Sequence, residues 1–335
     1  MRSVYSPRLL NGPFGDPAFY VRLAHRSEAL LFDCGELRRL PTREALKIST
    51  VFISHAHIDH MVGFDTLLRS FLYHDRTLLV YGPAGIADQI RGRLSGYTWN
   101  LTDGYPLVLI VREWDNGPGR EVTFRAANAF LPEGEQLWDG AGDLLLASDY
   151  LQVRALALDH GGIVSLAFAL QEPLHVAIHK DALERYGYRQ GVWLVGFKDL
   201  LRSGAAADTL LDVPLVDGGK IVLGLGELQA QIAHTERGMK IVYVTDVAPT
   251  TANQEMIAVF ARDAHLLAIE AVFPHAEFPR ALERNHLTAQ IAGELGRRAG
   301  AARLLTFHHS PRYQDQPELL TAEAMAAFSS NDASA

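Results

Sequence analysis

The stretch that decides the fold is Ser54-His55-Ala56-His57-Ile58-Asp59-His60, which overlaps the end of the apolar run TVFIS at residues 50–54. That run is short and rich in β-branched residues, so it predicts a strand. The apolar spacing just beyond it, over Met61–Tyr73, predicts a helix. The polar stretch therefore lies on the turn between a strand and a helix, where a loop can present side chains to a cleft.

Four potential metal ligands fall within six residues of this turn. Alternate residues of an extended chain share one side, so His55 and His57 are expected to point at one ion. Asp59 and His60, on the turn into the helix, can face a second ion. Imidazole nitrogens together with a carboxylate suit Zn²⁺, with Mn²⁺ or Fe²⁺ as alternatives. Burying so many imidazoles has no evident structural benefit without a metal, so the stretch predicts a metal centre.

Composition narrows the choice of ligands and partners. Cys34 is the only cysteine, which excludes an intrachain disulfide and a thiolate zinc cluster, so His, Asp or Glu must hold any metal. The 31 basic and 39 acidic residues give a net charge of −8, which argues against nucleic-acid binding by bulk charge. The N-terminus does not resemble a signal peptide, and no apolar run reaches the roughly 18 residues of a membrane span. We therefore expect a cytoplasmic protein without a membrane partner.

Strand patterns dominate the first two-thirds of the chain, and strand–helix alternation occurs near both ends. Helices are predicted over Thr251–Arg262, with Thr250 as N-cap, and over Leu287–Ala299. This order favours a sandwich of two sheets with helices outside. Apolar or β-branched runs predict strands at residues 18–24, 28–34, 50–54, 77–82, 121–127, 151–159, 164–170, 220–224, 240–246, 265–271 and 302–307.

One segment departs from this pattern. Residues 171–215 are rich in glycine, aromatic and charged residues and lack a strand period. We interpret them as an arm-like insertion in a single domain that spans residues 1–327, with a frayed tail at 328–335.

The motif His-x-His-x-Asp-His after a strand resembles the signature of the metallo-β-lactamase fold. Further segments, in the same order along the chain, resemble ribonuclease Z, the tRNA 3′-processing branch of that superfamily. Together they cover nearly the whole chain, and six in register are specific to the branch. These segments are LFDCGE (31–36), LDH (158–160) with SLAF (165–168), YVTD (243–246), IEAVF (269–273), HLTA (286–289) and LTFHHSPRY (305–313).

The resemblance implies an α+β fold, an αββα sandwich of two mixed sheets, with two Zn²⁺ ions per chain. His308 is favoured over His309 because the family's ligand lies two residues before the serine of Ser310-Pro311-Arg312-Tyr313. The implied ligands are His55, His57 and His160 for the first ion, Asp59, His60 and His308 for the second, and Asp246 as the bridge between them.

The resemblance also implies catalytic roles. Asp59 would accept a proton from the attacking water as well as binding metal. His286 would protonate the leaving oxygen, with Glu270 as its orienting partner. Arg312 could contact a phosphate.

The implied activity is metal-dependent phosphodiester hydrolysis, with removal of tRNA 3′ trailers and a homodimer as family expectations. Two departures leave the substrate open. Gly35-Glu36-Leu37-Arg38-Arg39 replaces a stretch of the family linked to recognition of the tRNA end, and residues 171–213 carry 5 positive and 6 negative charges where the family has a basic arm. A further departure is Ile58, which stands where the family usually has glycine and requires a negative φ at this turn. The alternative is a hydrolase of the same fold that acts on a small phosphodiester, an ester or a lactone. A flavodiiron-type redox protein is disfavoured because Ile58 occupies the position of its glutamate. A non-catalytic binding module is disfavoured by the intact ligand set.

Overall fold

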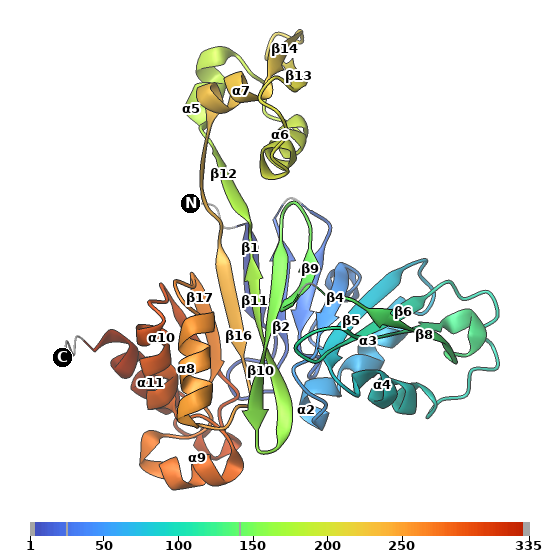
Figure 1. Ribbon diagram of the computed structural model, residues 1–335, viewed down its shortest axis with the longest axis vertical. Coiled ribbons are helices and arrows are strands. Elements are labelled where there is room, and N and C mark those ends of the chain that lie inside the picture. The colour runs from blue at the N-terminus through green and yellow to red at the C-terminus, as the bar shows by residue number, and fades with distance from the viewer. Residues whose placement is uncertain (1–3, 25, 141, 331–335) are drawn as a thin grey trace. The chain divides into compact units, whose positions relative to one another are not determined.

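The computed structural model describes residues 4–24, 26–140 and 142–330 (Figure 1). The chain divides into two compact units. The main unit comprises the chain up to Leu145, residues 154–169, and the chain from Lys240 onward. The arm unit comprises residues 146–153 and 170–239. In the described part of the chain, no helix is both long and apolar enough to cross a bilayer.

The described residues of the first sheet form eight strands that follow one another in chain order. The inner strands β3 to β6 are parallel and the outer ones antiparallel, so the sheet is mixed. Helices in the parallel crossovers are α1 (Thr42–Ala45), α2 (Ile58–Met61), α3 (Phe64–Phe71) and α4 (Ile86–Leu94). The strands are β1 (Tyr5–Leu9), β2 (Phe19–Leu23), β3 (Ala29–Phe32), β4 (Ile48–Phe52), β5 (Thr77–Pro83), β6 (Val108–Trp114), β7 (Gly119–Arg125) and β8 (Pro132–Trp138).

The second sheet has the strand order β18-β17-β16-β11-β10-β9. Its last three strands in the sequence, β16 to β18, are parallel. Helices α8 (Thr251–Phe260), α10 (Ala289–Arg298) and α11 (Leu319–Ser329) flank it, opposite the helices of the first sheet (Figure 1). The strands are β9 (Leu144–Ala147), β10 (Gln152–His160), β11 (Ile163–Gln171), β16 (Lys240–Val244), β17 (Leu266–Glu270) and β18 (Leu304–Phe307).

Strand alternation explains how the layers stack. In β4 and the residue after it, Val51 and Ile53 pack with the helices of the first layer, while Phe52 faces the other sheet. Phe52 stacks on Phe32 at 5.0 Å between ring centroids and also contacts Phe168 of the second sheet. These rings are fully buried, and burying each one stabilises the fold by about 1.5–3 kcal/mol. The predicted αββα sandwich is thus confirmed.

The expected helix over residues 61–73 is instead divided. Helix α2 begins at Ile58, and α3 begins only after Gly63. A Cβ on Gly63 would lie 1.9 Å from the carbonyl oxygen of Gly35, so the chain passes too close to that backbone for any other residue. The tail also differs from expectation, because residues 328 and 329 belong to α11; residues 331–335 lie outside the described residues.

The arm unit extends beyond the expected insertion, residues 171–215, to Met239. Although the segment lacks a strand period in its sequence, β12 (Leu174–Ile178) and β13 (Leu210–Pro214) lie within it. β12 pairs with β15 (Ala233–Arg237), and β13 pairs with β14 (Lys220–Gly224). With helices α5 (Lys180–Tyr186), α6 (Trp193–Arg202) and α7 (Leu225–Ile232) they enclose a small core that includes Val176, Phe197 and Leu228.

Candidate metal centre

The predicted site residues follow strand ends of the main unit. Because β16, β17 and β18 are parallel, their carboxyl ends meet at one edge of the sheet, which brings together Asp246, Glu270 and His308. His160 is the last residue of β10, and the cluster from His55 to His60 follows β4.

The first group of potential ligands is His55, His57, His160 and Asp246, whose nearest donor atoms all lie within 4.8 Å of one another. Asp246 Oδ2 is 3.6 Å from His55 Nε2 and 3.8 Å from His160 Nε2. Asp246 is buried, whereas His57 is exposed, so the group opens to solvent on the His57 side. The pair predicted from strand alternation, His55 and His57, does come together, with ring centroids 4.4 Å apart.

The second group is Asp59, His60 and His308. Asp59 Oδ2 lies 3.2 Å from His308 Nε2 and 3.6 Å from His60 Nε2. Asp246 connects the two groups, because its Oδ2 is 3.4 Å from His60 Nε2 and its Oδ1 is 2.9 Å from His308 Nδ1. A third group shares Asp246 and His308 and adds Glu270 and His286. All nine predicted site residues therefore lie in one connected cluster.

Three buried nitrogens test whether this cluster suits a metal. Nε2 of His55, Nε2 of His60 and Nδ1 of His308 have no hydrogen-bond partner among the described residues. A buried polar atom left without a partner costs about 1–3 kcal/mol. All three nitrogens surround the Asp246 carboxylate and are imidazole donors, which divalent transition metals prefer. The donor set thus fits divalent metal binding.

The Nδ1 atoms of three of the histidines contact oxygen atoms of the protein. His60 Nδ1 donates to Asp33 at 2.8 Å, and His160 Nδ1 donates to the carbonyl oxygen of Asn285 at 2.9 Å. His55 Nδ1 lies 3.0 Å from Ser54 Oγ. Each contact occupies Nδ1 and leaves Nε2 for a metal, an arrangement that fixes ring orientation in metal sites.

Neighbouring charges and burial together shift the pKa values of side chains in the cluster. Burial lowers the pKa of His55 to about 2, and the neighbouring His60 adds to the effect. Burial would also lower the pKa of His60, but the carboxylates of Asp246 and Asp33 outweigh it and raise that pKa to about 10. Asp246 is held ionised, because His308 and His60 keep its pKa well below the usual range despite burial. Without metal, protons occupy part of the cluster, so metal binding must release them.

Backbone conformation at the site is unusual for three residues. Asp33, Asp246 and His308 have φ values of 55°, 40° and 57°, in the left-handed region that residues other than glycine rarely adopt. Such conformations persist where surrounding structure enforces them, and they gather at functional sites.

His309 is kept out of the cluster. It is buried, its Nε2 lies 3.1 Å from Thr306 Oγ1, and its ring meets Phe14 edge-on at 5.1 Å. None of the three ligand groups includes it. Phe307, the residue before His308, ends β18 and stacks on Tyr243.

The structure also shows the positions of Ile58 and Arg312, the two other residues that the sequence singled out. Ile58 is the first residue of α2 and 76% exposed, so helical backbone accommodates a side chain where the family usually has glycine. Arg312 lies 3.4 Å from Glu277, so this arginine already has an anionic partner.

Two residues that support the cluster, Asp33 and Asn253, were not predicted from the sequence. Asp33 accepts hydrogen bonds from Ser54 and Tyr243 as well as His60. Asn253 binds the backbone of Asp159 and Ala248. A strand-ending aspartate in LFDCG was a visible signal for Asp33, whereas nothing in the sequence distinguishes Asn253.

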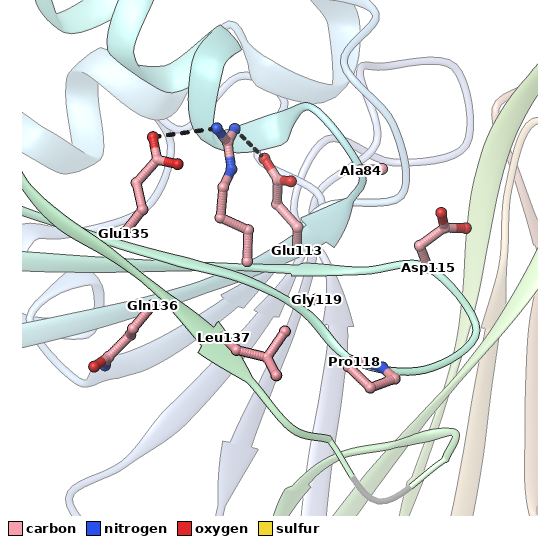
Figure 2. A pocket seen from close by; sticks show the side chains of 9 residues that line it. Ala84, Glu113, Asp115, Pro118, Gly119, Glu135, Gln136 and Leu137 are labelled. Atoms are coloured by element: carbon pink, nitrogen blue, oxygen red, sulfur yellow. Dashed lines mark hydrogen bonds and ion pairs between the residues drawn. The ribbon is translucent and has the colours of Figure 1, made fainter.

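A cavity of about 450 Å³ lies elsewhere in the main unit, among β6, β7 and β8 (Figure 2). Glu113 and Glu135 both point toward Arg120, at 2.8 and 3.4 Å. None of its lining residues belongs to the metal cluster, and two of its carboxylates, Glu113 and Glu135, are already paired with arginine. This cavity therefore does not compete with the cluster as the functional site.

Comparisons with known proteins agree with this geometry. The model of the beta-lactamase superfamily domain matches residues 29–133. The chain is 32% identical over 320 residues to a ribonuclease BN from Cronobacter sakazakii, covering 92% of this chain and 88% of that one. It is 29% identical over 330 residues to a ribonuclease Z from Deinococcus radiodurans, covering 96% of both.

Solved structures show the same fold. A metallo-β-lactamase-fold protein from Bacillus subtilis superposes with a TM-score of 0.55 at 16% identity, covering 96% of this chain and 92% of that one. The short form of human tRNase Z superposes with a TM-score of 0.51 at 19% identity, covering 92% of both chains.

Fold and site together define a metal-dependent hydrolase of the metallo-β-lactamase superfamily. The expected class of enzyme is thereby confirmed. Within that superfamily, the chain belongs to the ribonuclease Z family.

Proposed function

We propose that this protein is a dinuclear phosphodiesterase of ribonuclease Z type. The observation that carries the proposal is the position of Asp246 between the two ligand groups. His55, His57 and His160 would hold one Zn²⁺, Asp59, His60 and His308 the other, and Asp246 would bridge them. Mn²⁺ or Fe²⁺ would also suit these donors. Two such ions would polarise a phosphoryl oxygen and lower the pKa of water near them.

The chain's own residues would move the protons. Asp59 is partly exposed. Burial alone would raise the pKa of its carboxyl group, but His308 and His60 have the larger effect and lower that pKa to about 2. As a carboxylate at the open side of the cluster, it can accept a proton from attacking water.

His286 and Glu270 form a dyad beside the cluster. His286 Nδ1 donates to Glu270 Oε2 at 2.8 Å, and the Glu270 carboxylate raises the pKa of His286 against the effect of burial. A protonated His286 can donate to the leaving oxygen through Nε2, while Glu270 holds the ring in place. Glu270 is itself fixed by the backbone N–H groups of Val247 and Leu287.

For the substrate, we propose precursor tRNA, with cleavage of its 3′ trailer. The names of the relatives support this choice, as does the tRNase Z fold neighbour. The charge of the arm is the observation that favours a second candidate. Residues 170–239 carry 7 basic and 9 acidic residues, a net charge of −2, which gives phosphate groups little attraction. A small phosphodiester, an ester or a lactone is therefore the alternative. We also propose a homodimer located in the cytoplasm.

Turnover on three substrates would test these choices. Metal-loaded protein would be given precursor tRNA, bis(p-nitrophenyl) phosphate and a lactone in parallel, with Asp59→Ala as the inactive control. Cleavage at the 3′ end of the tRNA body supports the first choice. Turnover of the diester alone supports the small phosphodiester, and hydrolysis of the lactone alone would refute both phosphodiesterase proposals.

A further inference from the structure

A second pair of histidines lies in the arm unit, outside the metal cluster. His179 and His234 are both exposed, and Nε2 of His179 lies 3.0 Å from Nδ1 of His234. Their ring centroids are 4.9 Å apart and the ring planes differ by 28°. The function proposed above does not use either residue.

The geometry of the pair matches two imidazoles on one ion. When two imidazole nitrogens bind one ion with metal–nitrogen bonds of about 2.0–2.1 Å, the distance between them depends on the N–metal–N angle. It is roughly 2.9 Å for a right angle and 3.4 Å for the tetrahedral angle. The ring centroids then lie roughly 4.5–5.2 Å apart. A collinear N–H···N hydrogen bond of the same length would separate them by roughly 5.3 Å, and a bent one by less. The observed 4.9 Å lies within the range expected for two imidazoles on one ion.

The position of the pair is equally specific. His179 is the N-cap residue of α5, directly after β12, and His234 is the second residue of β15, directly after α7. The backbone N–H of His179 donates to the carbonyl oxygen of Ile232 at 2.8 Å, which fixes the spacing of the two segments. The pair thus lies where the β12–β15 ribbon meets the helices and hairpin of the arm unit. We call this place the neck of the arm.

One carboxylate lies near the pair. Register places Glu236 opposite His175 and His234 opposite Ala177, so Glu236 lies on the same face of the ribbon as His234, two residues along. Neither histidine is buried, so water can complete the coordination of an ion held by only two protein ligands.

We propose that His179 and His234 form a transition-metal site at the neck of the arm, which takes Zn²⁺, Ni²⁺ or Cu²⁺. An ion held there joins the two strands of the ribbon and closes the chain between residues 180 and 233. Its binding is independent of the cluster in the main unit and of the substrate that the enzyme cleaves.

Untagged protein is the material for the test. Zinc binding would be measured by equilibrium dialysis for the wild type, His179→Gln, His234→Gln and the double variant. We expect the wild type to bind one equivalent more than each of the three variants at saturation. His74→Gln, which removes a single exposed histidine of the main unit, is the matched control and should bind as much as wild type.

Two spectroscopic readouts locate the ion. Cu²⁺ added to zinc-loaded wild type should give an electron paramagnetic resonance signal with coupling to two nitrogens, absent from the double variant. Zn²⁺ should slow amide hydrogen exchange in residues 175–179 and 233–237 of the wild type alone. If the double variant keeps the extra equivalent, or the wild type never binds it, the proposal is wrong and the pair is only a hydrogen-bonded pair.

Discussion

Asp33 Oδ2 accepts a hydrogen bond from Nδ1 of His60 at 2.8 Å, with both side chains fully buried. The same carboxylate accepts hydrogen bonds from the backbone and hydroxyl of Ser54 and from the hydroxyl of Tyr243. Tyr243 comes from the second sheet, so Asp33 connects the two sheets directly beneath the cluster. This contact aims His60 Nε2 at Asp246 and keeps it free of a proton when a metal is bound.

Substitution Asp33→Asn should therefore weaken metal binding by about 10–100-fold, the usual effect of losing a partner that orients a metal-binding histidine. The amide can still accept a hydrogen bond but cannot balance a charge on the imidazole. Competition with a chromophoric chelator would measure the affinity. Tyr243→Phe removes one donor to the same carboxylate and is the control, expected to cost stability but little metal affinity. Equal losses in both variants would contradict the orienting role.

Metal stoichiometry tests the bridging position of Asp246. Elemental analysis of protein purified without chelator should approach two ions per chain, the number that two ligand groups sharing one carboxylate would hold. Asp246→Ala removes the shared ligand and should lower this number. A reproducible value of one that Asp246→Ala leaves unchanged would eliminate the dinuclear proposal.

The His286–Glu270 dyad predicts an effect that depends on the leaving group. His286→Gln should reduce turnover of a substrate with a poor leaving group by about 10²–10⁴-fold, while metal content stays normal. With nitrophenolate as leaving group the loss should be small, since that anion needs little protonation. Single-turnover rates on RNA and on bis(p-nitrophenyl) phosphate would be compared. Full activity of His286→Gln on RNA would remove its assignment as proton donor.

The sequence predicts more of the site than of the fold that supports it. The motif from His55 to His60 places ligands by strand alternation and by a turn, both local effects. Asp246, Glu270 and His308 were assigned from the resemblance of their segments to ribonuclease Z, not from any local pattern. By contrast, Gly63 interrupts a helix because of a contact with Gly35, and no local pattern reveals contacts between distant segments. The strand pairing within the arm could not be predicted for the same reason, since β12 pairs with β15 more than fifty residues later.

Asn253 illustrates the same limit and yields a prediction. Its buried amide accepts from Asp159 N at 3.2 Å, and its Nδ2 donates to the carbonyl oxygens of Asp159 and Ala248 at 2.9 and 2.8 Å. It thereby ties the strand that carries His160 to the loop that carries Asp246. Asn253→Ala should lower the free energy of unfolding by roughly 1–3 kcal/mol and weaken metal binding. Gln254→Ala, at the next position, is the control for helix α8; denaturant unfolding with and without metal would compare them.

The arm gives the prediction that separates the two substrate candidates. Affinity for RNA falls with salt in proportion to the number of phosphates neutralised, with a slope near −0.7 to −0.9 for each. Because residues 170–239 carry a net charge of −2, we expect weak tRNA binding with a shallow slope. Cleavage of small diesters should depend little on salt, since the cluster supplies the local charge.

Removal of the arm beyond its neck completes this test. The backbones of His179 and Ile232 are hydrogen-bonded at 2.8 Å, so a short glycine turn can replace residues 180–231, with Val176 and Ile232 of the arm core changed to polar residues because the deletion uncovers them. We expect the deletion to reduce tRNA turnover modestly and to spare diester turnover. Dissociation constants for precursor tRNA would be measured from about 50 to 200 mM salt, where several phosphate contacts become evident. A steep slope in the intact protein that disappears in the deletion would identify the arm as a tRNA-binding element despite its charge, and precursor tRNA would then be the better-supported substrate.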